Sequence, residues 1–455
     1  MRTLSTPHIQ LWQPTLYFFA FLIALRLASS GTAVLSFVLL AVYAFRGRRQ
    51  AIHALMLVWL FTMINSGIAP SPPATSLLRY IVLFSAAASV FMRSGFARGR
   101  VGLRLPEFLT LLIGLFIVAH SLVVSPEPIV SILKGISWTL AFMTSISAWG
   151  ALSADERSKV AKEIFLILLV VAVASLLLVP LSQGYMVRSG GGLFRGFLGH
   201  SQSLGATLAL LATWATALYL QRASWIYLVC LGLVLPLIFL TGARTALLAG
   251  LLGVTFSLLL TPVLSGRNIL NVAPALLGAK LWGAVFGGLV AAFIIIDPIS
   301  AQVDSFINKG RDFDNVVKAY EDSRGGLIDR MLVNIYENPI EGIGFGIASD
   351  PNDIVVQRVA GIPVSATVEK GIAPIATLEE LGIPGALLAA IWLWVLIVKG
   401  AHSGLAPLAV TGTILALNMG EATLFSPGGM GMLSIVLMGW TLSAARFRKR
   451  SRKMP

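Results

Sequence analysis

Three arginines stand in short turns between apolar segments of this chain. Arg188 and Arg195 belong to the stretch RSGGGLFRGFLG (188–199), and Arg244 belongs to the turn TGART (241–245). No acidic residue occurs between residues 182 and 199 to balance the first two. A guanidinium group binds phosphate through two parallel hydrogen bonds and keeps its charge at physiological pH. These turns predict either an anion-binding site or arginines that reach lipid headgroups and cap helix ends.

Four further charged residues lie around the start of an apolar segment. Glu369 and Lys370 precede a helix predicted to begin near residue 372, and Glu379 and Glu380 fall about two turns inside it. Acidic side chains at membrane depth are costly and normally face a polar cavity or a partner. Neighbouring residues of a helix point about 100° apart, so we expect only one of Glu379 and Glu380 to face a site.

The glycine-dense segment GIGFG (342–346) has two interpretations. It can expose backbone N–H groups toward an anion, or it can be a tight turn over the membrane surface. Metal chemistry has no support, because no Cys/His cluster has the spacing of metal ligands. The single cysteine, Cys230, lies in an apolar run and can form no intramolecular disulfide. We expect neither a metal nor another cofactor.

The elements that position these residues are membrane helices. Of the 455 residues 56% are hydrophobic and only 12% are charged, whereas soluble domains carry about 25% charged residues. The net charge of +14 is concentrated in short basic clusters at 46–49, 93–100 and 446–453. Such clusters between apolar segments are typical of cytoplasmic topology signals. Their placement argues against nucleic-acid binding.

Apolar segments of about the length of a membrane span, roughly 17–25 residues, predict an all-α polytopic protein with twelve to fourteen transmembrane helices. The first two segments are short and can be one broken unit, and the segment 403–418 is weak. No internal repeat is visible, and the first apolar stretch lacks a clear cleavage site, so we interpret it as an uncleaved span. The candidate segments are 14–28, 32–45, 51–68, 75–92, 107–124, 128–150, 162–181, 200–220, 224–241, 243–262, 275–297, 372–398, 403–418 and 430–446.

The distribution of basic residues predicts the orientation of these spans. With the N-terminus in the cytoplasm, the outside turns 66–75, 124–129 and 418–429 contain no lysine or arginine, and the basic clusters fall inside. Both termini are then cytoplasmic, and residues 1–455 form a single integral membrane domain. Arg188, Arg195 and Arg244 lie outside, against this rule. Their position favours a role in binding an anion.

One large outside segment, 298–371, interrupts the apolar pattern. It contains eleven acidic and seven basic residues, over half of the twenty acids in the chain. A connection of this length normally has structure of its own. Apolar residues at helical spacing predict a helix over 324–336, ended by the Pro/Gly-rich ENPIEGIGFG. We therefore expect a partly helical periplasmic loop.

Three stretches together resemble the O-antigen ligase and polysaccharide polymerase superfamily of bacterial inner membranes. They are RGFLGHSQSLGATLAL (195–210), LTGARTALLAGLLG (240–253), and SRGGLIDRMLVNIYENPIEGIGFG (323–346) followed by LEELGIPG (378–385). The resemblance covers roughly residues 160–400 and depends on the order and spacing of these motifs around one large outside loop. It implies metal-independent, inverting glycosyl transfer from an undecaprenyl-pyrophosphate-linked glycan.

The resemblance also implies roles for individual residues. Two arginines that hold the donor pyrophosphate correspond to Arg195 and Arg324, with Arg244 and Arg330 in support. Arginines suit this role because they can stabilise the negative charge that develops on a pyrophosphate leaving group. The implied partners are the lipid-linked glycan, a glycan acceptor and membrane lipids, with chain-length regulator and export proteins as further candidates.

The sequence departs from the ligases of this family at one position. Ligases carry a histidine near the end of the large loop, where this chain has VEKG (368–371), and the whole loop lacks histidine. His200 lies near enough in the predicted topology to reach the site. Glu369 takes the place of the histidine and is the first candidate for the general base, although an exposed Glu369–Lys370 pair explains the residues equally well. Lys370 can also bind phosphate, and Glu379 or Glu380 is the fallback base.

The missing histidine favours a polymerase of exopolysaccharide, capsule or O-antigen repeat units. Two alternatives stay open: a ligase that transfers lipid-linked glycan to lipid A core or another acceptor, and a transporter or flippase of lipid-linked sugars. A transporter favours charged or broken helices near the midplane in repeated halves. Here the candidate catalytic and binding residues gather on one face of the membrane, which favours an enzyme.

Overall fold

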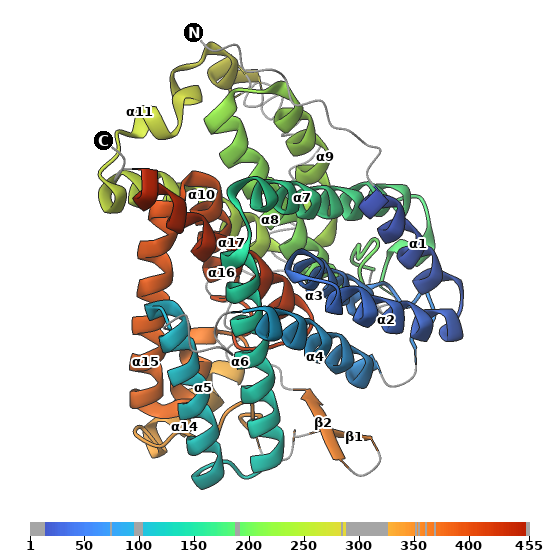
Figure 1. Ribbon diagram of the computed structural model, residues 1–455, viewed down its shortest axis with the longest axis vertical. Helices are drawn as coiled ribbons and strands as arrows, with labels where there is room; N and C mark the ends of the chain where they lie inside the picture. Colours follow the sequence, from blue (N-terminus) through green and yellow to red (C-terminus); the bar gives the residue numbers. More distant parts are fainter. Residues whose placement is uncertain are drawn as a thin grey trace.

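The computed structural model describes residues 14–72, 75–94, 103–186, 192–283, 285–287, 326–350, 353, 355–359, 362–367 and 370–451. This part of the chain is helical except for one β-hairpin (Figure 1). Seven of its helices are long and apolar enough to cross a membrane, as expected for a multi-pass helical membrane protein. They are α4 (Thr75–Arg93), α5 (Leu105–Val123), α6 (Pro128–Ala151), α7 (Ala154–Leu177), α8 (Ser201–Arg222), α10 (Arg244–Ser265) and α15 (Ala373–Ser403).

The remaining apolar helices are shorter. They are α1 (Pro14–Ala28), α2 (Ser30–Phe45), α9 (Trp225–Thr241), α16 (Leu405–Leu417) and the part Met430–Ser443 of α17 (Met430–Ser451). The predicted span 51–68 corresponds to α3 (Arg48–Met63), whose residues 51–61 are all buried. The short helix α11 (Ile269–Val272) precedes the predicted span 275–297, which begins in η3 (Pro274–Leu277). Residues 284 and 288–297 of this span lie outside the described residues. The full number of spans therefore stays a prediction.

The first two predicted spans are separate helices. Ser29 ends the first and caps the second: its Oγ accepts a hydrogen bond from Thr32 N at 3.1 Å, and its N–H donates to Thr32 Oγ1 at 3.0 Å. This reciprocal pair satisfies donors at the start of α2. The chain reverses at this cap, and α1 and α2 pack against each other.

Helix α16 forms the centre of the C-terminal half and packs against α8, α10 and α17. Small residues permit its close approach to α10, because a Cβ atom at Gly253 would lie 2.6 Å from the backbone nitrogen of Thr413. The Thr413 hydroxyl also donates to Thr213 of α8 at 2.9 Å. The weak apolar signal at 403–418 thus marks a short helix buried among other helices.

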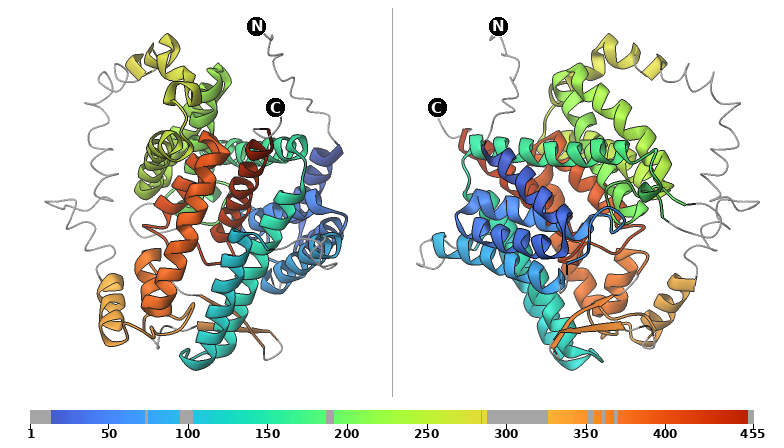
Figure 2. Two further views of the ribbon diagram at one scale, coloured as in Figure 1. Left: turned by 60° about the vertical axis from the view of Figure 1, so that its left-hand side comes forward. Right: turned by 90° about the vertical axis from the view of Figure 1, so that its right-hand side faces the viewer.

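The turns sort into two groups at opposite ends of the helices. At one end, Gly199 N donates to Met63 O at 2.7 Å and Ala373 N donates to Asn418 O at 2.9 Å. At the other end, Arg157 of α7 donates to Ser443 O at 2.6 Å. The first group contains the turns predicted to lie outside, and we call it the outer end. Figure 2 shows the arrangement of the helices from two further directions.

The large loop contains the predicted helix, here α14 (Gly326–Glu337). It also contains an antiparallel hairpin of β1 (Val355–Val359) and β2 (Ile362–Thr367), with a register shift between Gln357 and Arg358. This hairpin is a local exception to the predicted all-α fold, since every other described element is a helix. Residues 298–325, which make up the first part of the loop, lie outside the described residues.

Candidate functional site

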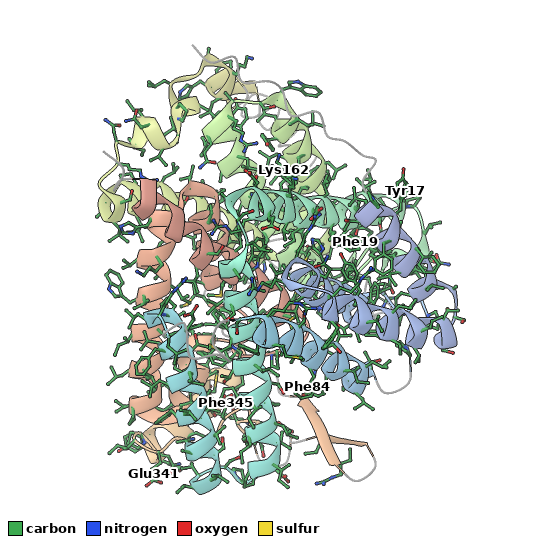
Figure 3. The ribbon with its side chains drawn as sticks, viewed as in Figure 1. Tyr17, Phe19, Phe84, Lys162, Glu341 and Phe345 are labelled. Atoms are coloured by element: carbon green, nitrogen blue, oxygen red, sulfur yellow. The ribbon has the colours of Figure 1, made fainter. Side chains whose placement is uncertain are left out.

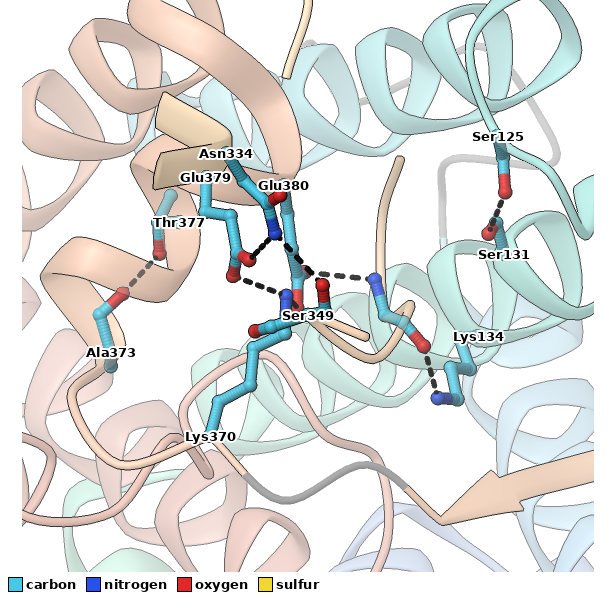
Figure 4. A network of polar contacts seen from close by, with 11 residues as sticks. Ser125, Ser131, Lys134, Asn334, Ser349, Lys370, Ala373, Thr377, Glu379 and Glu380 are labelled. Atoms are coloured by element: carbon cyan, nitrogen blue, oxygen red, sulfur yellow. Dashed lines mark hydrogen bonds and ion pairs between the residues drawn. The ribbon is translucent and has the colours of Figure 1, made fainter. Parts of the chain in front are cut away.

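A buried lysine between two carboxylates marks the outer end (Figure 4). The ammonium nitrogen of Lys370 lies 2.7 Å from Glu379 Oε2 and 3.1 Å from Glu380 Oε1. The side chains of Lys370 and Glu379 are 2% and 0% exposed, and that of Glu380 is 12% exposed. Charges removed from water in this way require close partners. Both carboxylates share one ammonium group, so both glutamates belong to the same polar network.

The second oxygen of each carboxylate is also bound. Asn334 of α14 donates from Nδ2 to Glu379 Oε1 at 2.7 Å and to Ser349 O at 2.9 Å. The backbone N–H of Gly346 donates to Glu380 Oε2 at 2.8 Å. Helix α14, the glycine-rich turn and the start of α15 are thereby joined in one polar network. Sequence reasoning missed Asn334, because an asparagine in an amphipathic helix carries no signal of a distant partner.

The glycine-rich turn docks on a break in α15. Gly382 has φ +61°, and the following Pro384 lacks the N–H that would bond to the carbonyl of Glu380. The turn supplies the missing donors: Ile343 N donates to Glu379 O at 2.9 Å and Gly344 N to Glu380 O at 3.0 Å. These hydrogen bonds make the break a defined joint between the glycine-rich turn and α15.

This geometry decides between the two interpretations of GIGFG. The N–H groups of Ile343, Gly344 and Gly346 all bind oxygen atoms of Glu379 or Glu380. The segment is therefore a turn whose anion is the chain's own Glu380 carboxylate, and these three donors are already used. Phe345 of the turn is buried, whereas the nearby Glu341 is exposed (Figure 3).

Lys134 of α6 connects the same turn to the helices. Its ammonium group donates to Gly346 O at 2.6 Å. Gly346 has φ +66°, and a Cβ atom there would lie 2.6 Å from Lys134 Cδ. Sequence reasoning gave Lys134 no role. The cost of a lysine at that depth was the signal that could have found its partner.

Arg195 lies in the turn before α8 with its charge unbalanced. Its Nε atom is buried and has no hydrogen-bond partner within the described ranges, and no carboxylate there pairs with it. Asn65 holds the turn to the end of α3, donating from Nδ2 to Gln183 O at 2.8 Å and to Gly196 O at 2.9 Å. A Cβ atom at Gly67 would lie 2.9 Å from Arg195 Nη2. A positioned guanidinium of this kind can bind an anion.

Arg79 of α4 is a second arginine at this end, and sequence reasoning gave it no role. Its guanidinium lies 5.1 Å from the ring centroid of Tyr80 and against Gly428, where a Cβ atom would collide with it. The next residue, Gly429, lies against Met63, which also binds the turn of Arg195 through Gly199. Arg79 and Arg195 thus flank the same turn after α3.

The other predicted residues have different settings. Arg244 begins α10 and is half-buried, and the adjacent Thr245 lies against Gly420 of the outer end. His200 is the N-cap of α8, where its Nδ1 accepts from Gln202 N at 3.2 Å. Arg330 is exposed and pairs with Asp350 at 2.5 Å and Asp353 at 3.5 Å. Arg188, Arg324 and Glu369 lie outside the described residues.

A metal-binding arrangement does not occur in the part of the chain that the structure describes. No group of three or more histidine, cysteine, aspartate or glutamate side chains comes together there. The chemistry available at the outer end is that of guanidinium groups, carboxylates and one shared ammonium group.

Comparisons with known proteins add no relative to this picture: no family model matches the chain, and no curated protein matches it.

Proposed function

We propose that the chain is a membrane glycosyltransferase that joins undecaprenyl-pyrophosphate-linked repeat units into a polysaccharide at the periplasmic face of the inner membrane. The observation that carries the proposal is the unbalanced guanidinium of Arg195 at the outer end. A membrane enzyme with a lipid pyrophosphate donor needs fixed positive charge at the membrane surface. The resemblance of the motifs around Arg195 to the ligase and polymerase superfamily supports the same function.

The proposed reaction is a single displacement. The hydroxyl oxygen of the acceptor attacks the anomeric carbon of the donor sugar, and the bond from that carbon to the phosphate oxygen breaks. The hydroxyl proton passes to a carboxylate, and undecaprenyl pyrophosphate leaves as an anion. Configuration at the anomeric carbon inverts, and the reaction needs no metal.

The proposal assigns the leaving group to arginines. Arg195 and Arg324 hold the pyrophosphate, and Arg244 and Arg188 support them. Arg330 fits this role less well, because Asp350 and Asp353 already balance its charge. His200 contributes through its cap, which fixes the start of α8 beside Arg195.

The proposal assigns the proton to Glu369, the residue that takes the place of the family's histidine. Between the two fallback bases, Glu380 is the better candidate. Its side chain keeps some exposure, whereas that of Glu379 is fully buried. Lys370 is a positioning residue in this scheme, since its buried ammonium group is bound by both glutamates and is withdrawn from phosphate.

Product analysis in cells that lack the gene tests the function. A deletion strain that accumulates single repeat units, with long polymer restored by the wild-type chain, supports the polymerase. Arg324→Ala and Glu369→Gln should then insert normally and fail to restore chain length. Long polymer that stays on its lipid carrier in the deletion strain would instead indicate the ligase, and unchanged glycans would contradict both enzymes.

Substitution of Arg195 tests the donor site. Arg195→Lys keeps the charge and loses the two-pronged geometry, so we expect polymer formation to fall about 100-fold or more. Arg330→Ala is the matched control, because this exposed arginine is already paired and should leave most activity. Full activity of Arg195→Ala at normal expression would overturn the assignment.

A further inference from the structure

Helix α14 leaves an apolar face uncovered in the loop at the outer end. Leu332, Val333 and Tyr336 are exposed, Tyr336 to 89%. Their positions fall within about 100° of the helix circumference, a sector that the exposed Asp329 shares in the first turn of the helix. The opposite side of the helix is occupied, because Met331 is buried and Asn334 binds Glu379. A helix with one packed side and one exposed apolar side requires a partner on the second.

The exposed face continues onto α15. Ile340, 66% exposed, follows Pro339, whose carbonyl accepts a hydrogen bond from Ile383 N of α15 at 3.0 Å. Beyond that bond, Ile383, Leu387, Ile391 and Trp394 are all exposed at spacings of one helical face. Since α15 is a candidate membrane span, this stripe is the surface that faces lipid chains. Figure 2 shows α14 beside the end of α15.

We propose that α14 is a membrane-surface helix, and that the acyl chains of the outer leaflet cover Leu332, Val333, Tyr336 and Ile340. The hydrogen bond between Ile383 N and Pro339 O joins the apolar surface of α14 and Ile340 to the lipid-facing stripe of α15, with the exposed Glu337 and Glu341 beside it. Tyr336 suits the membrane–water boundary, where its ring lies among chains and its hydroxyl reaches headgroups. The exposed, ion-paired Arg330 lies on the polar side of this surface.

The consequence is that the bilayer itself helps to position the polar network. Asn334 of α14 donates a hydrogen bond to Glu379. Anchoring α14 at the membrane surface therefore keeps Asn334 within reach of Glu379. The inference concerns lipid contact alone and stands independently of the proposed glycosyl transfer.

Site-directed cysteine labelling tests the lipid contact in the full chain. Cys230 is buried, and a preparation without added cysteine gives the background. Val333→Cys, Tyr336→Cys and Ile340→Cys are labelled with an environment-sensitive fluorophore and reconstituted into phosphatidylcholine and phosphatidylglycerol vesicles with brominated acyl chains. Arg330→Cys is the exposed control on the same helix.

We expect blue-shifted emission and at least twofold stronger quenching by brominated lipid at positions 336 and 340 than at 330. Equal quenching at all positions, with equal access to aqueous iodide, would overturn the proposal in favour of a solvated helix. Blue-shifted emission without bromine quenching would overturn it in favour of a protein partner. Position 340 lies beyond the end of α14, so it gives an answer even where a substitution within the helix disturbs folding.

Discussion

At the scale of residues, the outer end is organised by charges that are mostly neutralised from within. Lys370 binds Glu379 and Glu380, and the remaining carboxylate oxygens are taken by Asn334 and Gly346. Ion pairs buried this deeply add little net stability, but the loss of one partner leaves an uncompensated charge. Lys370 is therefore a structural anchor for the start of α15.

Replacement of Lys370 by methionine should destabilise the protein strongly. The buried Glu379 carboxylate would lose its cation, at a cost of about 3–5 kcal/mol, so we expect a lower midpoint of thermal unfolding in detergent. The double variant Lys370→Met/Glu379→Gln should lose much less than the sum of the two single losses. Lys399→Met, on the same helix and without a described ion pair, is the control. Additive losses would show that the two residues act independently.

Arg79 makes a contrasting prediction, because its described contacts are a tyrosine ring and a glycine. Under the proposed function Arg79→Ala should reduce polymer formation at least tenfold while membrane insertion and thermal stability stay near wild type. Arg222→Ala, an exposed arginine at the opposite end of α8, should have no effect. Activity should be measured as polymer length on gels with normalised expression. Equal activity of both variants would show that Arg79 takes no part in donor binding.

At the scale of elements, the break in α15 joins the large loop to the membrane helices. Two carbonyls released by the break accept N–H groups of the glycine-rich turn, and Ile383 N donates back to Pro339 O. The result is a short stretch of backbone pairing between segments about forty residues apart in the sequence. Gly382 permits this arrangement because its φ of +61° is in the left-handed region.

Gly382→Ala should disrupt this joint. The left-handed conformation costs about 1–2 kcal/mol for a residue with a Cβ, and the new atom would also collide with Ile340 O. We expect a low yield of monodisperse protein by size-exclusion chromatography. We also expect a lower midpoint of thermal unfolding, measured from the monodisperse fraction that remains after heating. Gly232→Ala in α9, where the structure has open space around the added atom, should be tolerated. Equal behaviour of the two variants would contradict the tight docking.

At the scale of the whole molecule, successive turns of the chain lie at opposite ends of the packed helices. The contacts of Gly428 with Arg79 and of Gly429 with Met63 join turns from the two halves of the chain. Arg157 and Ser443 do the same at the other end. The candidate site is therefore composite and forms only when both halves have packed. Its orientation in the membrane is a proposal from the basic residues.

Thiol labelling checks this orientation in intact spheroplasts. Pro126→Cys, in the turn between α5 and α6, should react with a membrane-impermeant maleimide added outside. Arg222→Cys, at the other end, should react only after permeabilisation, because basic turns are retained in the cytoplasm. The reverse pattern would invert the assigned topology, and labelling of both positions from one side would contradict the alternation of turns.

Much of the architecture could be predicted from the sequence because it depends on local patterns. The length of the apolar segments predicted the helices, and the turns without lysine or arginine predicted one group of turns. The helical spacing of apolar residues predicted α14. The membrane-depth cost of Glu379 and Glu380 predicted that they would have partners. The break in α15 at Gly382 and Pro384 was not predicted, although a proline within a helical segment favours one.

Only the tertiary structure decided which residues are those partners. Lys134 meets Gly346 and Asn334 meets Glu379 across long stretches of chain, and no local pattern specifies such pairs. It also decided that both glutamates share Lys370 and that the glycine-rich turn is occupied by Glu380. Arg330 is paired, whereas Arg195 has no carboxylate partner among the described residues. The physical reason is that periodicity is set by neighbouring residues, whereas the compensation of a buried charge is set by whatever the packed helices bring within hydrogen-bond distance.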